Sequence, residues 1–398
     1  MMRTLLTRPA TVATLFTVAI LGLVAPRLGA AQFVNDDFGY YVDIPESWEI
    51  MDASDMSHVA FSSPNGAAVM QILSFSPDRF EELEDIGEFV EQQFDSEGEA
   101  DAFGFSGREA AFGELSFDTQ NFTVRGYHVI VNGEAGDYIM QAFAIEDAFD
   151  EYEDELFSAL DSVSLDDEGY LHPGPVSQYR YPFPAPNPQP EEIEIEGESI
   201  NYTADPTEKE AGQQLIEREA RILTQHADEA AAAEGRWSGD DDAWVEAWRR
   251  FYRMIYRDSY FRISSLARSL EQHFDEEDVP EEEIPSRLLD WFQGFEYSRT
   301  GSLSDLLAPV TCFLEETGDC DSLGLAYVIV LQHMGFDAIL MVSSEYSHAL
   351  AGVDVEGEGA RFEFDDTEYL LAEFTEDVDM GMIPQSMADP GKWIPVRL

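Results

Sequence analysis

The chain has 398 residues, 44% of them hydrophobic, and a formal net charge of −59. This apolar content is enough for packed cores, which excludes a disordered acidic chain, and the length predicts two domains with a linker. The acidity excludes a nucleic-acid-binding protein, because such proteins need a basic surface.

The acidic residues are spread along the whole chain and do not form a tail. The sequence has 81 acids and 22 bases, and only two of the bases are lysines, Lys209 and Lys392. Repulsion between surface carboxylates is screened in concentrated salt, where the Debye length falls to about 3 Å at 1 M. We therefore predict an acidic protein adapted to a salty, halophilic environment. The alternative is that the charge binds cations or a basic partner.

Residues 1–31 are predicted to be a signal peptide. Arg3 and Arg8 precede an uncharged apolar run at 11–26, and small residues follow at Gly29, Ala30 and Ala31. This order is typical of an export signal, and the run is short for a membrane span. We expect the mature protein to be secreted or periplasmic, outside the cytoplasm. Any membrane contact would come from the same segment, if it stayed uncleaved as an anchor.

Residues 32–168 are predicted to form an α+β domain. Alternating patterns predict strands at 38–45, 46–50, 59–62, 67–75, 113–117, 123–132 and 136–145, with helices at 80–94 and 149–160. This pattern favours an antiparallel α/β sandwich. The opening spacing of Tyr40, Ile44, Pro45 and Trp48 resembles that of PsbP/Mog1-like domains. The resemblance implies a binding or scaffolding module.

Residues 169–190 are predicted to be a proline-rich linker, and 191–398 a second domain. Seven prolines between 173 and 190 favour a semi-rigid polyproline spacer. The second domain is expected to begin with a strand at 192–196. Long helices are then predicted over 207–233 and 241–274, followed by a helix that Pro285 opens.

The segment that points to chemistry begins at Gly318, Asp319 and Cys320. Asp319 is a good N-cap and Gly335 a good C-terminal stop, so a buried helix is predicted between them. Cys320 would then lie in the first turn, where the helix dipole favours a nucleophilic thiolate.

The residues after this helix predict strands that would carry a base and an acid. Strands are expected at 338–342 and 347–355, and a turn at Glu356-Gly357 would return the chain as a partner strand at 358–365. In that register His348 would face Asp365. His348 would take the proton of Cys320, and Asp365 would orient the imidazole.

These three motifs resemble the transglutaminase-like superfamily. The family pattern has a Gly-Asp-Cys helix start, a strand opening with His-Ala and a strand ending in Asp-x-Thr, here Gly318 to Cys320, His348-Ala349 and Asp365 to Thr367. The resemblance covers 291–398 and implies a nucleophile helix packed on an antiparallel sheet. Asp366 stands where proline is common in the family, which leaves Asp366, and more distantly Glu373, as alternative acids.

Two further features concern the same site. Gln293 is a candidate donor to an oxyanion, with the Cys320 backbone N–H as the second donor; the alternative is an ordinary helix residue. Cys312 and Cys320 are an even pair of cysteines in an exported protein, so a structural disulfide or a reversible redox bond is the alternative to a catalytic thiol.

The sequence as a whole predicts a thiol-dependent acyl-transfer enzyme that acts on amide or peptide bonds. It would be a cysteine peptidase or amidase, or a transglutaminase-like acyltransferase, with Cys320, His348, Asp365 and Gln293 at the site. The expected substrate is a peptide or protein, for example in the cell envelope, and no cofactor or metal is expected. The alternative is a non-catalytic envelope scaffold with the same fold.

Overall fold

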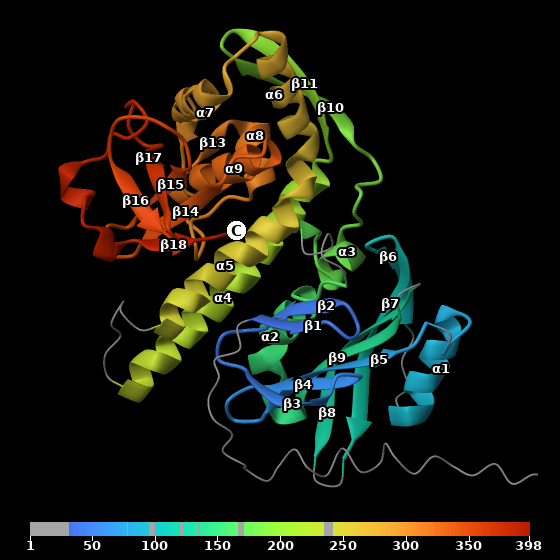
Figure 1. The fold of residues 1–398 in the computed structure, drawn as a ribbon. Helices are drawn as coiled ribbons and strands as arrows, with labels where there is room; N and C mark the ends of the chain where they lie inside the picture. The colour runs from blue at the N-terminus through green and yellow to red at the C-terminus, as the bar shows by residue number, and fades with distance from the viewer. Residues whose placement is uncertain are drawn as a thin grey trace, which may run out of the picture.

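The computed structural model describes residues 32–77, 79–94, 100–119, 122–133, 136–165, 171–234 and 242–398. The predicted signal peptide, 1–31, lies outside these residues. Antiparallel sheets and helices build the chain, so the α+β prediction is confirmed (Figure 1). Among the described residues, no helix has the length and apolarity needed to cross a membrane.

The N-terminal half is built on one antiparallel sheet. Within the described residues it has seven strands, in the order β3 (Glu49–Asp55), β4 (His58–Ser62), β5 (Ala68–Phe75), β9 (Asp137–Ile145), β8 (Thr123–Asn132), β7 (Arg108–Asp118) and β6 (Ala100–Phe105). A hairpin of β1 (Gln32–Asn35) and β2 (Tyr40–Asp43) lies beside it.

Both faces of this sheet are covered, because successive side chains along a strand point to opposite faces. Val129 and Val131 of β8 pack in the cluster that contains α2 (Phe149–Asp161). Ile130, between them, packs in a separate cluster with Ile86 of α1 (Leu83–Phe94). The two helices predicted from sequence therefore lie on opposite faces of the sheet.

The proline-rich segment differs from the predicted plain spacer. Residues 175–180 form a short helix, α3 (Pro175–Arg180), in which Pro175 and Val176 are buried. The ring of Tyr179 stacks on Phe112, with centroids 4.6 Å apart, and its hydroxyl donates to Asp101 at 2.8 Å. Aromatic residues between the prolines thus attach the segment to the N-terminal half, a contact that proline spacing alone does not reveal.

Two long helices connect the halves of the chain. A hairpin of β10 (Gln189–Ile195) and β11 (Glu198–Ala204) leads into α4 (Thr207–Glu234), which packs against α5 (Asp242–Ser259) (Figure 1). The single helix predicted over 241–274 is in fact two, α5 and α6 (Ser264–Glu276), separated by a 3-10 turn. The buried Arg262 ends α5, since its Nε donates to the Asp258 carbonyl at 3.0 Å. The helix opened by Pro285 is α7 (Ile284–Gln293).

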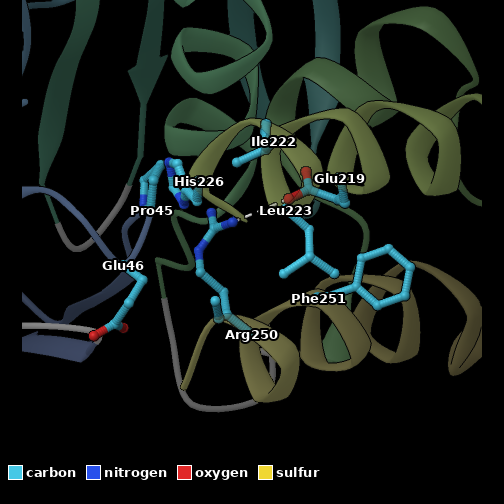
Figure 2. Close-up of a pocket in the computed structure, with 9 residues that line it drawn as sticks. Pro45, Glu46, Glu219, Ile222, Leu223, His226, Arg250 and Phe251 are labelled. Carbon is cyan, nitrogen blue, oxygen red and sulfur yellow. Dashed lines mark hydrogen bonds and ion pairs between the residues drawn. The ribbon is translucent and has the colours of Figure 1, made fainter. Parts of the chain in front are cut away.

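Buried arginines of α5 join these helices to the N-terminal half. Arg250, 3% exposed, donates to the Asp43 carbonyl at 2.8 Å, to Glu219 of α4 at 3.0 Å and to the Ser158 hydroxyl at 2.8 Å. Arg253 donates to both carboxylate oxygens of Asp43, at 2.8 and 3.0 Å. Figure 2 shows Arg250 reaching from α5 toward Glu219. These guanidinium groups keep their charges paired in the interior, as buried charges require.

A small cavity of about 10 Å³ lies in the same interface, lined among others by Pro45, Glu46 and His226 (Figure 2). The pKa of Glu46 is raised to about 7 by burial and by the negative charges of Glu246 and Asp43, against the opposing effect of Arg253 and Arg250. The interface therefore contains an acid that ionises near neutral pH.

The C-terminal half is organised around α9 (Cys320–His333) and a second antiparallel sheet. Within the described residues this sheet has five strands, in the order β16 (Arg361–Phe364), β17 (Thr367–Ala372), β15 (His348–Val353), β14 (Ala338–Ser343) and β18 (Ile394–Val396). The apolar helix α9 packs across β14 and β15. Asp319 caps it as predicted, accepting the Ser322 N–H at 3.0 Å. A short helix, α8 (Pro309–Glu315), packs beside α9, and β12 (Glu296–Tyr297) pairs with β13 (Thr317–Gly318).

The predicted hairpin at Glu356-Gly357 is wrong. β15 pairs with β14 and β17, whereas β16, among the described strands, pairs only with β17, with Phe364 opposite Thr367. The chain reverses at Asp365 and Asp366, whose φ angles are +49° and +64°. A two-residue hairpin turn favours positive φ at both positions, and Asp tolerates it. The Asp-Asp pair is therefore a turn, and β17 replaces β16 beside β15.

Candidate functional site

A cavity of about 230 Å³ lies at the start of α9, next to the first residue of β15. Its walls come from α9 and the residue before it, from the ends of β14 and β15 and the loop between them, from the loop before α8, and from single residues of α5 and β18. The lining residues are Trp248, Arg299, Ser304, Asp305, Asp319, Cys320, Asp321, Val342, Ser343, Ser344, Ser347, His348 and Ile394. The structure thus brings the predicted nucleophile and the predicted base to one cavity.

Cys320 is the first residue of α9 and is 3% exposed. Its thiol donates to Asp321 Oδ1 at 3.3 Å. Burial raises the pKa of the Cys320 thiol well above its ordinary value, and the charges of Asp321 and Asp319 add to this, whereas a hydrogen bond from the Ala349 backbone N–H lowers it. We predicted a thiolate from the helix dipole, but burial and two carboxylates disfavour that charged form. Cys320 therefore rests as a thiol.

His348 opens β15, opposite Ser343 at the end of β14. Its Nε2 is 2.7 Å from Glu373 Oε2, and the His348 side chain is only 9% exposed. The other ring nitrogen, Nδ1, has no hydrogen-bond partner in the described part of the chain. A carboxylate on Nε2 favours the tautomer with its proton there, which leaves Nδ1 as the acceptor.

Glu373 directly follows β17 and is 1% exposed. Its Oε1 accepts from the Thr375 backbone N–H at 2.8 Å and from the Thr375 hydroxyl at 2.7 Å. Burial alone would raise the pKa of the Glu373 carboxyl, but the hydrogen bond and charge of His348, together with Thr375, bring it below the ordinary value. Glu373 is thus a fixed carboxylate that orients His348.

Asp365 does not lie beside His348, which corrects the sequence prediction. It occupies the turn between β16 and β17, and its Oδ2 accepts from Arg397 Nε at 3.3 Å on an exposed surface. The reason is the register described above, because the strand that contacts β15 ends at Ala372, directly before Glu373. The acid-x-Thr spacing that drew attention to Asp365 also occurs at Glu373, Phe374 and Thr375. Glu373, the most distant of the alternative acids in the sequence analysis, is the one that contacts His348.

Gln293 is also misplaced for its predicted role as an oxyanion donor. Its Nε2 donates to the carbonyls of Glu373 and Val378, each at 2.9 Å, so both amide hydrogens are used. These hydrogen bonds tie the backbone of Glu373 to Gln293, the last residue of α7. Gln293 therefore holds the backbone of the acid and is not among the residues that line the cavity.

The two cysteines are free and buried, with no disulfide between them. Cys312, in α8, is fully buried, and burial raises the pKa of its thiol strongly. Cys320 alone of the two lines the cavity. Across the described residues, no group of three or more His, Cys, Asp or Glu side chains is arranged to hold a metal ion.

No known protein family matches the sequence, and no curated protein matches it. Similar solved structures include the PsbP protein CyanoP from Synechocystis sp. PCC 6803, with a TM-score of 0.29 and 14% identity over 37% of this chain and 98% of that chain. A protein from Bacteroides thetaiotaomicron has a TM-score of 0.26 and 9% identity over 83% of this chain and 88% of that one.

A third similar structure is LpqN, involved in cell envelope biogenesis of Mycobacterium tuberculosis. Its TM-score is 0.21, with 14% identity over 31% of this chain and 81% of that chain. At these TM-scores the likenesses are weak, and no statement about activity follows from them.

Proposed function

We propose that this protein is a thiol-dependent acyl-transfer enzyme that acts on amide or peptide bonds through Cys320, His348 and Glu373. The observation that carries the proposal is the 2.7 Å contact between the buried Glu373 and His348, beside a cavity that Cys320 also lines. A nucleophile, a base and an acid that orients the base are the parts that such chemistry needs.

In this mechanism His348 acts as a general base, because Cys320 rests as a thiol. Nδ1 takes the thiol proton while Sγ attacks the substrate carbonyl, and the imidazolium is stabilised by Glu373. His348 then protonates the leaving amine, and the acyl group remains on Sγ. Water or an amine takes the acyl group in the second half, so the product is an acid or a new amide.

The oxyanion of the tetrahedral intermediate needs donors near Cys320. The backbone N–H of Cys320 lies in the first turn of α9, where N–H groups have no carbonyl of their own helix to bind. Such N–H groups at a helix start stabilise negative charge. They replace Gln293, whose amide is already used.

The chain order of nucleophile helix, histidine strand and acid strand supports a transglutaminase-like core. The helix α9 packs on β15 and β14, and the acid directly follows β17, the neighbour of β15. We propose in addition that the protein works outside the cytoplasm, on envelope peptides or extracellular proteins, on the basis of the signal-like sequence at 1–31. The proposal keeps the predicted division into a first domain that ends at 168, a linker that ends at 190, and a second domain.

The second candidate is a non-catalytic scaffold with the same fold. It is favoured by the raised pKa of Cys320 and by the thiol's contact with Asp321, both of which oppose nucleophilic attack. The two candidates differ in whether Cys320 forms an acyl-enzyme.

The test is acylation of the protein by p-nitrophenyl acetate in concentrated salt. The enzyme should release a burst of p-nitrophenol and carry one acetyl group on Cys320, detected by mass spectrometry. His348→Ala should lose the burst, and Cys312→Ala should retain it. Added primary amine should divert the acetyl group to an amide if the enzyme is a transferase. An intact protein without a burst at any pH from 6 to 9 would favour the scaffold.

A further inference from the structure

Asp321, next to the nucleophile, has a fixed carboxylate that the proposed mechanism does not use. Its Oδ1 accepts from the Cys320 thiol at 3.3 Å, and its Oδ2 accepts from the Tyr252 hydroxyl at 2.8 Å. Tyr252 is fully buried in α5, so its hydroxyl holds the carboxylate in place. Asp321 is one of the residues that line the 230 Å³ cavity.

The charges around the cavity leave Asp321 without a cation. Asp305, Asp319 and Asp321 line the cavity as acids, and Arg299 and His348 are its basic residues. Arg299 lies 3.8 Å from Asp305 and also donates to the Tyr297 hydroxyl, while His348 is paired with Glu373. In the described part of the chain, Asp321 is hydrogen-bonded only to the thiol and to Tyr252.

This arrangement by itself opposes the chemistry. A carboxylate beside the thiol disfavours the thiolate and competes with His348 for the thiol proton. A positive group at Asp321 would remove both effects at once. The cavity has the volume for such a group, and a cation near a half-buried carboxylate is attracted more strongly than in bulk water.

We propose that Asp321 is a specificity-determining residue that binds a cationic group, an ammonium or a guanidinium, carried by the acyl substrate next to its reacting carbonyl. The inference rests on the proposed function and names its substrate class. When the cation binds, Asp321 releases the thiol, whose proton passes to His348 Nδ1 as Sγ attacks. With a substrate that lacks the cation, the thiol of Cys320 stays hydrogen-bonded to Asp321 and reacts more slowly.

The first experiment uses methanethiosulfonate reagents that differ in charge: aminoethyl (positive), methyl (neutral) and sulfonatoethyl (negative). They are applied to the folded protein with the Cys312→Ala change, in 3 M KCl to screen the general negative charge. The rate of Cys320 modification is followed by intact mass. The positive reagent should react faster than the neutral one, relative to the same reagents on a free thiol, and the negative reagent slower.

Asp321→Asn should reduce this positive-to-neutral rate ratio by about tenfold and increase the rate of the neutral reagent. Asp321→Glu should retain the preference. The matched control is Glu363→Gln, which removes one exposed acid of β16 far along the sheet from β14 and should change nothing. A ratio that Asp321→Asn leaves unchanged in a folded protein would overturn the proposal.

The second experiment compares the p-nitrophenyl esters of acetyl-lysine and acetyl-norleucine, which differ mainly in the ammonium group. We expect kcat/KM to be at least tenfold higher for the lysine ester, and Asp321→Asn to remove the difference. Equal kcat/KM values for the two esters would overturn the proposal while leaving the proposed function intact. If neither ester acylates Cys320, the proposed function itself fails, whatever the methanethiosulfonate rates show.

Discussion

Replacing Glu373 with glutamine tests which acid orients the histidine. The variant keeps the size of the side chain and an oxygen for Thr375, but it puts an amide N–H where His348 Nε2 now finds a carboxylate. His348 must then accept at Nε2 and carry its proton on Nδ1, so it is no longer able to take the thiol proton. The variant also loses the carboxylate that stabilises the positive charge of the imidazolium.

The size of the effect follows from the bond that is removed. A hydrogen bond to a charged group contributes about 1.5–3 kcal/mol. At 1.36 kcal/mol for each factor of ten, its loss corresponds to about a 10- to 150-fold decrease in acylation rate. The 1% exposure of Glu373 places the expected effect in the upper part of this range, because water does not screen the pair.

The assay is the rate of Cys320 acylation by p-nitrophenyl acetate, with Asp365→Asn as the matched control. Asp365 has an exposed ion pair with Arg397, of a kind that contributes about 0–1 kcal/mol, and asparagine suits its positive φ. Asp365→Asn should therefore acylate at the wild-type rate. A large loss in Asp365→Asn, or a wild-type rate in Glu373→Gln, would refute the reasoning.

Three further predictions concern the interface and the second cysteine. Arg250→Ala should lower the free energy of unfolding by about 1.5–3 kcal/mol in denaturant titrations at constant salt, because it removes a buried hydrogen bond to the charged Glu219, which keeps its pairing with Arg218; a change below about 1 kcal/mol would contradict this. Because the folded pKa of Glu46 is raised to about 7, the native state binds the extra proton, so stability should fall as pH rises from about 4.5 to 7. Glu46→Gln should reduce that fall, which melting temperatures across pH would show, and a variant as pH-sensitive as wild type would contradict it. Cys312→Ala should leave the alkylation rate of Cys320 unchanged with and without reductant, whereas a dependence on Cys312 would indicate a redox link between the two thiols.

The elements that follow local rules were predictable from the sequence. The helix α9 and its cap at Asp319 depend on residues within a few positions of each other, and both were found where expected. The two helices of the N-terminal half were recognised from periodicity for the same reason. Cys320 and His348 lie at the starts of such elements, and the cavity contains both.

The acid was not predictable in this way, because it depends on which strand lies beside β15. The turn at Glu356-Gly357 and the turn at Asp365-Asp366 both fit local chemistry, and only the pairing of β15 with β17 separates them. The partners of the buried arginines of α5 likewise depend on tertiary contacts. The role predicted for Gln293, a donor to the oxyanion, is wrong, because its amide donates to two carbonyls that are distant in sequence.

The most direct test of the central claim is the pH dependence of Cys320 alkylation by iodoacetamide, measured on the protein with Cys312→Ala in concentrated salt. The account predicts that Cys320 reacts near neutral pH through proton transfer to His348. In the His348→Ala variant no base takes the proton of the thiol, whose pKa is raised. The alkylation rate at pH 7 should therefore fall at least tenfold and recover only in alkaline solution. Identical rate profiles with and without His348 would contradict the claim that this histidine activates the thiol.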